Sequence, residues 1–348
     1  MRKGGKIRVL IVDDSRLVRE LIGAILAEDQ DIEVVGEAVD GCQGVEKALL
    51  LKPDLITMDI EMPVMGGLEA IERIITARPT PILVVTAQTG VRVAFNAIAK
   101  GALEVIEKPD ISLDNAARLL QRIRLLARVD VITHLRVMSG QPRRAAEAVA
   151  RESPPEARGN GAGIIAIAAS TGGPQAINTI LGALPAHFPL PIVVAQHIAD
   201  GFTRGMVDWL GAGTRLKVLL ARSGDVLAPG VVHVNPGENS MYLVKGGRII
   251  LGDKDPIRRF SPSCDTLLGA VAELYRDRAV GVILSGMGSD GVMGIRAIKG
   301  MGGRTIAQDE ASSVVYGMNQ EAVKSGSVDR ILPLAEIPRA LMKLAGCR

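Results

Sequence analysis

The stretch GIIAIAASTGGPQAI, residues 163–177, decides how the second half of the chain folds. Its continuous apolar run predicts a buried strand, and the small residues AASTGG at 168–173 predict a tight turn. Pro174 then suits the first turn of a helix. A buried strand followed at once by a turn and a helix is typical of a parallel α/β sheet. This arrangement leaves one hydroxyl, that of Ser170, at the carboxyl end of the strand.

The same alternation of short apolar runs and amphipathic segments fills both halves of the chain. The first half contains IRVLIVDD, IEVVGEA, DLITMDI, PILVVTA and ALEVIEK, and the second half adds PIVVAQH, KVLLA, AVGVILS and RTIAQ. The segment MYLVKGGRIIL, residues 241–251, places two short apolar runs around a Gly-Gly pair and predicts a hairpin. We therefore expect an α/β protein with two doubly wound parallel-sheet domains, the second of which carries an antiparallel hairpin.

A change of composition separates the two predicted domains. The alternation stops near Arg128, and residues 118–158 contain nine arginines against four acidic residues. This segment leads into the turn-rich ESPPEARGNGAG, residues 152–163. We expect a first domain at 1–127, a linker at 128–158 and a second domain at 159–348.

The composition also narrows the classes of partner. Aromatic residues make up only 2% of the 348 residues and the net charge is +3, which argues against nucleic-acid binding. The three cysteines are widely spaced, so they predict neither a disulfide framework nor a thiolate metal site. No apolar run is long enough to span a bilayer. We expect a cytoplasmic protein with no nucleic-acid partner and no membrane insertion.

Three acidic side chains come directly after predicted strands of the first domain. Asp13 and Asp14 follow the first strand and Asp59 follows the third. The carboxyl ends of parallel strands form a common crevice, where three carboxylates would repel one another without a cation such as Mg²⁺. Thr86 and Lys108 end the fourth and fifth strands, and their hydroxyl and ammonium groups could bind phosphoryl oxygens.

This set of residues resembles the receiver domain of two-component response regulators, over residues 6–127. The resemblance implies that Asp59 accepts a phosphoryl group from a histidine kinase, with Mg²⁺ held by the acidic set that contains Asp13, Asp14 and Asp59. Thr86 and Lys108 would support the phosphoryl group. Val105 stands where the family often has an aromatic residue, which puts the usual aromatic switch in doubt.

Ser170 has three possible roles: part of a phosphate loop, a nucleophile, or part of a plain tight turn. A phosphate loop is disfavoured because no Gly-Lys-Ser/Thr ending supplies a cation. A dinucleotide site is suggested by LSGMGSDG at 284–291, which matches G-x-G-x-x-G and is followed by Asp309. Asp290 counts against that site, because its charge would face a pyrophosphate.

A nucleophilic serine requires a base and an orienting acid. Among the four histidines only His197 ends a strong predicted strand, one strand–helix unit after Ser170. His134 falls in the linker, His187 in a polar turn and His233 within a strand. Asp290 follows another strand of the same sheet. An imidazole that takes the serine proton while a carboxylate holds it is the established way to activate a hydroxyl.

The motifs ASTGGP, QH with FT, NPG, PSCD, LSGMGSDG and AQDEASSVVYGM together resemble the chemotaxis protein-glutamate methylesterases, the CheB family, over nearly the whole chain. The resemblance implies Ser170 as nucleophile, His197 as base, Asp290 as orienting acid, and an oxyanion hole near Thr171 and Met287. The implied substrates are glutamyl methyl esters on methyl-accepting chemoreceptors, hydrolysed to methanol without a cofactor. Many members also deamidate receptor glutamines.

Two positions depart from the family pattern. Ser240 and Phe260 stand where the family often has histidines, which suggests altered substrate contacts. A non-catalytic adaptor that only binds a receptor or kinase stays open as the alternative function. For the enzyme, we expect the unphosphorylated receiver to cover the Ser170 edge and phosphorylation of Asp59 to open it.

Overall fold

The computed structural model of the chain describes residues 5–87, 91–108, 113–129, 131, 162–253 and 262–347. The chain divides into two compact units, Met1–Leu135 and Arg136–Arg348. The predicted linker, residues 128–158, falls almost wholly outside the described residues, as do His134 and Phe260. Within the described residues, every helix is too short or too polar to cross a bilayer.

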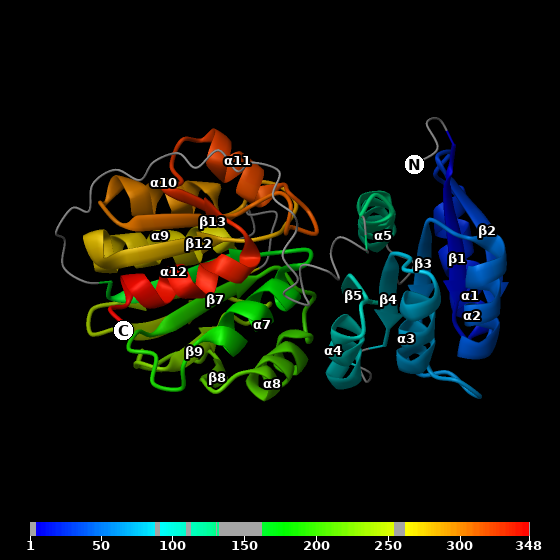
Figure 1. Cartoon of the computed structure of the whole chain (residues 1–348), viewed down its shortest axis with the longest axis horizontal. Helices are drawn as coiled ribbons and strands as arrows, with labels where there is room; N and C mark the ends of the chain where they lie inside the picture. Colours follow the sequence, from blue (N-terminus) through cyan, green and yellow to red (C-terminus); the bar gives the residue numbers. More distant parts are fainter. Residues whose placement is uncertain are drawn as a thin grey trace. The chain divides into compact units, whose positions relative to one another are not determined.

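The first unit is a five-stranded parallel sheet between two layers of helices (Figure 1). The strands lie in the order β2-β1-β3-β4-β5, so the order reverses between β1 and β3 and opens a crevice at their carboxyl ends. Helix α1 packs against α5, while α3 packs against both α2 and α4. The elements are β1 (Ile7–Val12), α1 (Arg16–Ala27), β2 (Ile32–Ala38), α2 (Gly41–Leu51), β3 (Leu55–Met58), α3 (Gly67–Ala77), β4 (Ile82–Thr86), α4 (Val91–Ala99), β5 (Glu104–Glu107) and α5 (Leu113–Leu126).

The second unit is a seven-stranded parallel sheet in the order β14-β13-β12-β6-β7-β9-β8. Its strands are β6 (Ile164–Ala169), β7 (Ile192–Gln196), β8 (Lys217–Leu220), β9 (Val231–Val234), β12 (Ala279–Ile283), β13 (Arg304–Gln308) and β14 (Arg330–Leu332). Its α-helices are α7 (Gly173–Ala183), α8 (Thr203–Gly213), α9 (Cys264–Tyr275), α10 (Val292–Gly300), α11 (Met318–Lys324) and α12 (Ile337–Leu344). Both predicted parallel sheets are confirmed; the short edge strand β14 was not predicted.

The predicted hairpin is confirmed as β10 (Ser240–Val244) and β11 (Arg248–Gly252), an antiparallel pair outside the main sheet. Gly246 and Gly247 turn the chain between them at φ +84° and +67°, where glycine has no Cβ to clash. One face of the hairpin, including Met241 and Ile249, packs into the core beside α9. Ser240 is buried at the start of β10.

The core of the second unit determines where its crevice lies. Strand β6 is completely buried in the middle of the sheet, with β12 on one side and β7 on the other. The chain leaves β6 towards β7 and returns later to form β12, so the direction of winding reverses at β6. In such sheets ligands bind at the carboxyl ends of the strands that flank the reversal. Ser170 lies at that point.

Candidate active site

The carboxyl ends of β6 and β7 bring Ser170 and His197 onto neighbouring strands. Ala169 and Gln196, the last residues of the two strands, are directly paired, and the N–H of His197 donates to the carbonyl of Ala169 at 3.0 Å. On the other side, the N–H of Ser170 donates to the carbonyl of Ser285, just after β12, at 3.0 Å. Ser170 therefore lies between the segment that carries His197 and the segment that leads to Asp290.

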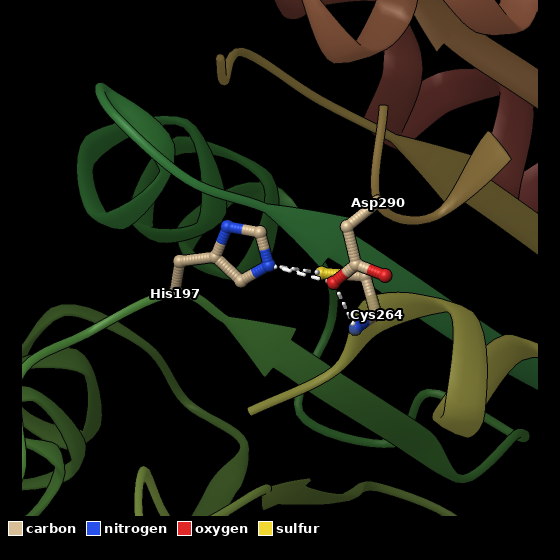
Figure 2. Close-up of side chains that lie close together, drawn as sticks. All are labelled: His197, Cys264 and Asp290. Carbon is tan, nitrogen blue, oxygen red and sulfur yellow. Dashed lines mark hydrogen bonds and ion pairs between the residues drawn. The ribbon is translucent and has the colours of Figure 1, made fainter. Parts of the chain in front are cut away.

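His197 and Asp290 are in direct contact although they lie far apart in the chain. Nε2 of the imidazole is 2.8 Å from Oδ2 of the carboxylate, and both side chains are only 7% exposed (Figure 2). Because Nε2 contacts the acid, a hydroxyl that reacts with this ring would give its proton to Nδ1. An imidazole held in this way has a defined tautomer and orientation, as a general base requires.

The N-terminus of α9 holds the Asp290 carboxylate. The N–H groups of Cys264 and Asp265 donate to it at 2.7 and 3.0 Å, and the Ser263 hydroxyl, which caps the helix, donates at 3.3 Å. The free N–H groups and the dipole at a helix N-terminus stabilise an anion.

The support is reciprocal between two helices. Oδ1 of Asp265, in the first turn of α9, accepts the N–H groups of Gly291 and Gly294 at the start of α10, at 2.9 and 2.8 Å. Asp290 comes directly before Gly291. The start of α9 therefore binds the carboxylate next to α10, and the start of α10 binds the carboxylate of Asp265 in α9. This exchange determines where Asp290 points.

These contacts keep Asp290 ionised. Burial by itself would raise the pKa of the carboxyl group, but the hydrogen bond from His197 and those from the N–H groups of Asp265 and Cys264 outweigh it, so the pKa is lowered. The arrangement therefore stabilises the charge that develops when the imidazole takes a proton.

Glycines permit the close approach of the loops around Ser170. A Cβ on Gly286 would lie 2.8 Å from Cβ of Ser170 and 2.3 Å from Sδ of Met318, so a larger residue at 286 would push the serine loop away. Gly172, at φ +77°, starts α7 in the left-handed region that suits glycine. The turn after β6 is therefore built for tight packing around the serine.

The described contacts of Ser170 are all made by its backbone, and the residue is buried. Thr171 is also buried, and its carbonyl accepts the Ser285 hydroxyl at 2.7 Å. Met287 lies half-buried in the loop that leads to Asp290. The two positions expected to form an oxyanion hole are thus on the loops that flank Ser170, after β6 and β12.

Gln196 is a residue of the site that sequence reasoning quoted only as part of a motif. Its Nε2 donates to the carbonyls of both Ser170 and His197, at 2.8 and 2.9 Å, from a wholly buried position. No local pattern signals these two contacts, because they depend on the pairing of β6 with β7.

The contacts of two acidic residues distinguish a dinucleotide site from a nucleophilic serine. Both Asp309 and Asp290 bind other groups of the protein. Oδ1 of Asp309 accepts the N–H of Ser312 at 3.0 Å and its hydroxyl at 2.5 Å. Asp290 is bound to His197 and α9. The acid that a ribose would need is therefore committed to its own loop, which favours the nucleophilic role for Ser170.

The first unit brings the other predicted site residues together. Carboxylate oxygens of Asp13, Asp14 and Asp59 lie within 4.8 Å of one another, a cluster typical of a Mg²⁺ site. Nζ of Lys108 is 2.8 Å from both Asp13 and Asp59. Thr86 is buried at the end of β4, where its carbonyl accepts the N–H of Lys108 at 2.9 Å. Val105 is half-buried on β5.

The charges of this cluster are only partly balanced. Burial raises the pKa of Asp13, and the nearby Asp59 adds to the effect, which outweighs the lowering by Lys108. The pKa of Lys108 is raised: burial lowers it, but the hydrogen bonds to Asp13 and Asp59 outweigh the burial. Crowded carboxylates of this kind are relieved by a hard divalent cation, so the residues fit Mg²⁺.

Known proteins resemble the chain along its whole length. Residues 165–341 match the family model for the CheB methylesterase, and residues 9–124 match the model for the response regulator receiver domain. The protein-glutamate methylesterase/protein-glutamine glutaminase 3 of Paramagnetospirillum magneticum is 46% identical over 351 residues, covering 98% of this chain and 97% of that protein. The corresponding protein 2 of Anaeromyxobacter dehalogenans is 46% identical over 342 residues, with 97% of each chain covered.

A solved structure supports the assignment of the second unit. The crystal structure of the Thermotoga maritima CheB methylesterase catalytic domain has 37% sequence identity and a TM-score of 0.51. The match covers 53% of this chain and 98% of the solved one.

Proposed function

The chain belongs to the CheB family of response-regulator methylesterases, and from this premise we propose that it hydrolyses glutamyl methyl esters on chemoreceptors under the control of its receiver unit. The relatives are also named as protein-glutamine glutaminases, so the same site would convert receptor glutamines to glutamates. The enzyme would work in the cytoplasm.

The proposed hydrolysis assigns a task to each residue of the second unit. The Ser170 hydroxyl attacks the ester carbonyl while Nδ1 of His197 takes its proton, and Asp290 stabilises the imidazolium. Backbone N–H groups near Thr171 and Met287 hold the oxyanion. The imidazolium returns the proton to the leaving methoxide, which departs as methanol. Water then attacks the acyl-enzyme by the same route and frees the glutamate and the serine; for an amide the leaving group is ammonia.

The proposed control resides in the acidic crevice of the first unit. Asp59 accepts a phosphoryl group from the histidine kinase of the chemotaxis system. Asp13, Asp14 and Asp59 would hold Mg²⁺, which would neutralise charge on the phosphoryl oxygens during transfer. Lys108, whose Nζ is 2.8 Å from Asp59, would pair with the phosphoryl group on that residue, and Thr86 lies at the same sheet edge.

One observation carries the esterase assignment. Nε2 of His197 contacts the ionised carboxylate of Asp290, and His197 follows the strand that pairs with the strand before Ser170.

The test is the variant Ser170→Ala in the full chain, for which methanol release from a methylated receptor fragment is measured. We expect the rate to fall by at least about a thousandfold, because the nucleophile is lost. Ser289→Ala, at an exposed serine of the loop before α10, should keep the rate. A Ser170→Ala protein that still releases methanol would reject the triad.

A further inference from the structure

The imidazole nitrogen that contacts Asp290 also faces a thiol. Nε2 of His197 is 2.8 Å from Oδ2 of Asp290 and 3.6 Å from Sγ of Cys264, and one ligand atom from each residue lies within 4.8 Å of the others (Figure 2). The three side chains come from the end of β7, the first turn of α9 and the loop before α10. The hydrolysis described above uses the imidazole and the carboxylate but gives the thiol no task.

The three atoms nearly have the spacing that a tetrahedral zinc ion requires. Thiolate, imidazole and carboxylate are the ligands that Zn²⁺ takes in proteins. With Zn–S of about 2.3 Å and Zn–N of about 2.05 Å, the sulfur and nitrogen of a tetrahedral site are about 3.5 Å apart. Sγ and Nε2 are already 3.6 Å apart. The carboxylate at 2.8 Å has to withdraw by only about half an ångström to reach a ligand position.

The surrounding groups would keep the ligands in place. Oδ1 of Asp290 accepts the N–H of Asp265 at 3.0 Å and the hydroxyl of Ser263 at 3.3 Å, while Oδ2 accepts the N–H of Cys264 at 2.7 Å. An ion would replace the contact of Oδ2 with Nε2 of His197, and the N–H of Cys264 would continue to hold this oxygen. Groups that orient the ligands of a metal add to its affinity. The spacing of the cysteines predicts no thiolate metal site, but the fold brings one thiol beside an imidazole and a carboxylate from distant segments.

We propose that Cys264, His197 and Asp290 form an inhibitory site for Zn²⁺ and similar soft divalent ions. Burial, and after it the charge of Asp290, raises the pKa of the Cys264 thiol well above its usual value, so the ion has to displace this proton, which passes to solvent. The single proton of the neutral imidazole then moves from Nε2 to Nδ1. Nδ1 then has no lone pair for the Ser170 proton, so the ion stops ester hydrolysis without touching the serine. The effect on rate rests on the proposed function, whereas the binding itself does not.

The experiment uses the full chain with Cys42→Ser and Cys347→Ser, which removes the other two thiols, in excess Mg²⁺ to occupy the acidic crevice. Zn²⁺ alone is titrated by calorimetry, and Co²⁺ is added in parallel as a spectroscopic probe. We expect one Zn²⁺ per chain and a sulfur-to-cobalt charge-transfer band. Cys264→Val and His197→Gln should each weaken binding by more than about 100-fold, since even residues that only orient ligands are worth about 10- to 100-fold. His187→Gln, at an exposed histidine, is the matched control and should bind as before.

Either of two results would overturn the site. One is Zn²⁺ binding of equal strength with and without the Cys264 thiol, and the other is Co²⁺ bound with no sulfur band in the chain that keeps Cys264. The second measurement decides the matter even if a variant fails to fold. In the rate assay, Zn²⁺ should suppress methanol release by the chain that keeps Cys264. The Cys264→Val protein should release methanol at the same rate with and without Zn²⁺. A failure of the proposed function would show separately, as no methanol release before any Zn²⁺ is added.

Discussion

One glutamine ties the two reacting residues to the same sheet edge. Nε2 of Gln196 donates to the carbonyls of Ser170 and His197, so a single buried amide spans the ends of β6 and β7. A buried carbonyl that loses its donor costs about 1–3 kcal/mol. The contacts therefore maintain the relative position of nucleophile and base, although the glutamine touches neither reacting atom.

We predict that Gln196→Met lowers kcat by about 10- to 100-fold and leaves KM nearly unchanged, because small displacements of reacting groups are costly while the substrate contacts remain. Steady-state methanol release measures both constants. Gln320→Met is the control: Gln320 lies half-buried on α11, and its Oε1 accepts from Nζ of Lys324 at 3.3 Å, on the same helix. An equal loss of kcat in both variants would show that Gln196 contributes only stability.

His233 makes the second unit sensitive to acid. Burial lowers the pKa of this β9 histidine; Asp225 opposes the effect and Lys217 adds to it. The pKa of His233 is lower in the folded chain than in the unfolded chain. As the pH falls below about 6.5, the unfolded chain therefore binds a proton at this ring before the folded chain does. Stability contributed by the neutral ring is present above that pH and is lost as the pH falls through it.

We predict that the unfolding temperature of the second unit falls between about pH 7.5 and about pH 5.5, and that His233→Leu reduces this fall. Calorimetric scans at both pH values measure the difference. His187→Leu, at an exposed position, should keep the original dependence. If His233→Leu shows the full fall, another group is responsible.

Sequence reasoning could find the polar groups at strand ends but not their partners. Ser170, His197 and Asp290 each follow an apolar run, so their placement on one edge was predictable from the rule for parallel sheets. The contact of Cys264 with His197, and that of Asp290 with α9, join residues far apart in the chain. Such contacts depend on how helices pack on the sheet, for which no local pattern exists.

At the scale of elements, the loop between β3 and α3 contains a strained residue. Val64 has φ +65° and is 87% exposed, and the N–H of Met65 closes a three-residue turn onto the carbonyl of Pro63 at 2.7 Å. A β-branched residue in the left-handed region is disfavoured by about 1–2 kcal/mol, and an exposed side chain gains little packing in return.

We predict that Val64→Asn stabilises the first unit by about 1 kcal/mol, because asparagine adopts this conformation more readily. The unfolding temperature of that unit should rise by a few degrees in a calorimetric scan. Val39→Asn replaces a partly exposed valine without a positive φ in the same unit and should bring no gain. No difference between the two variants would mean that the turn is not strained.

Elements differ in how well their pattern predicts them. Long apolar runs such as those of β1, β6 and β7 were unambiguous, and the Gly-Gly pair located the hairpin. Strand β14 has three residues, two of them exposed at the sheet edge, so its sequence carries no run to detect. Its pairing with β13 comes from the sheet that is already formed.

At the scale of the whole molecule, each unit has its own core and its own reversal of strand order, with polar candidate site residues at the carboxyl ends of the strands there. The predicted linker lies outside the described residues, and the domain boundaries stay predictions.

We predict that a small-molecule phosphoryl donor with Mg²⁺ raises methanol release by the full chain by about 5- to 150-fold, the usual range for coupled sites. Chelation of Mg²⁺ before the donor is added, or Asp59→Asn, should abolish the increase, whereas Asp31→Asn, at an exposed acid, should keep it. An equal rate with and without the donor would reject activation by the receiver.

The way α9 holds Asp290 has a consequence for how freely this enzyme can diverge. Two of the donors to the carboxylate are main-chain groups at positions 264 and 265, and every residue except proline brings such a group with it. The side chain at position 264 can therefore change during evolution while the carboxylate of Asp290 stays ionised and keeps its orientation. A thiol could be acquired there at little cost to hydrolysis, and with it a new sensitivity to the metal content of the cell.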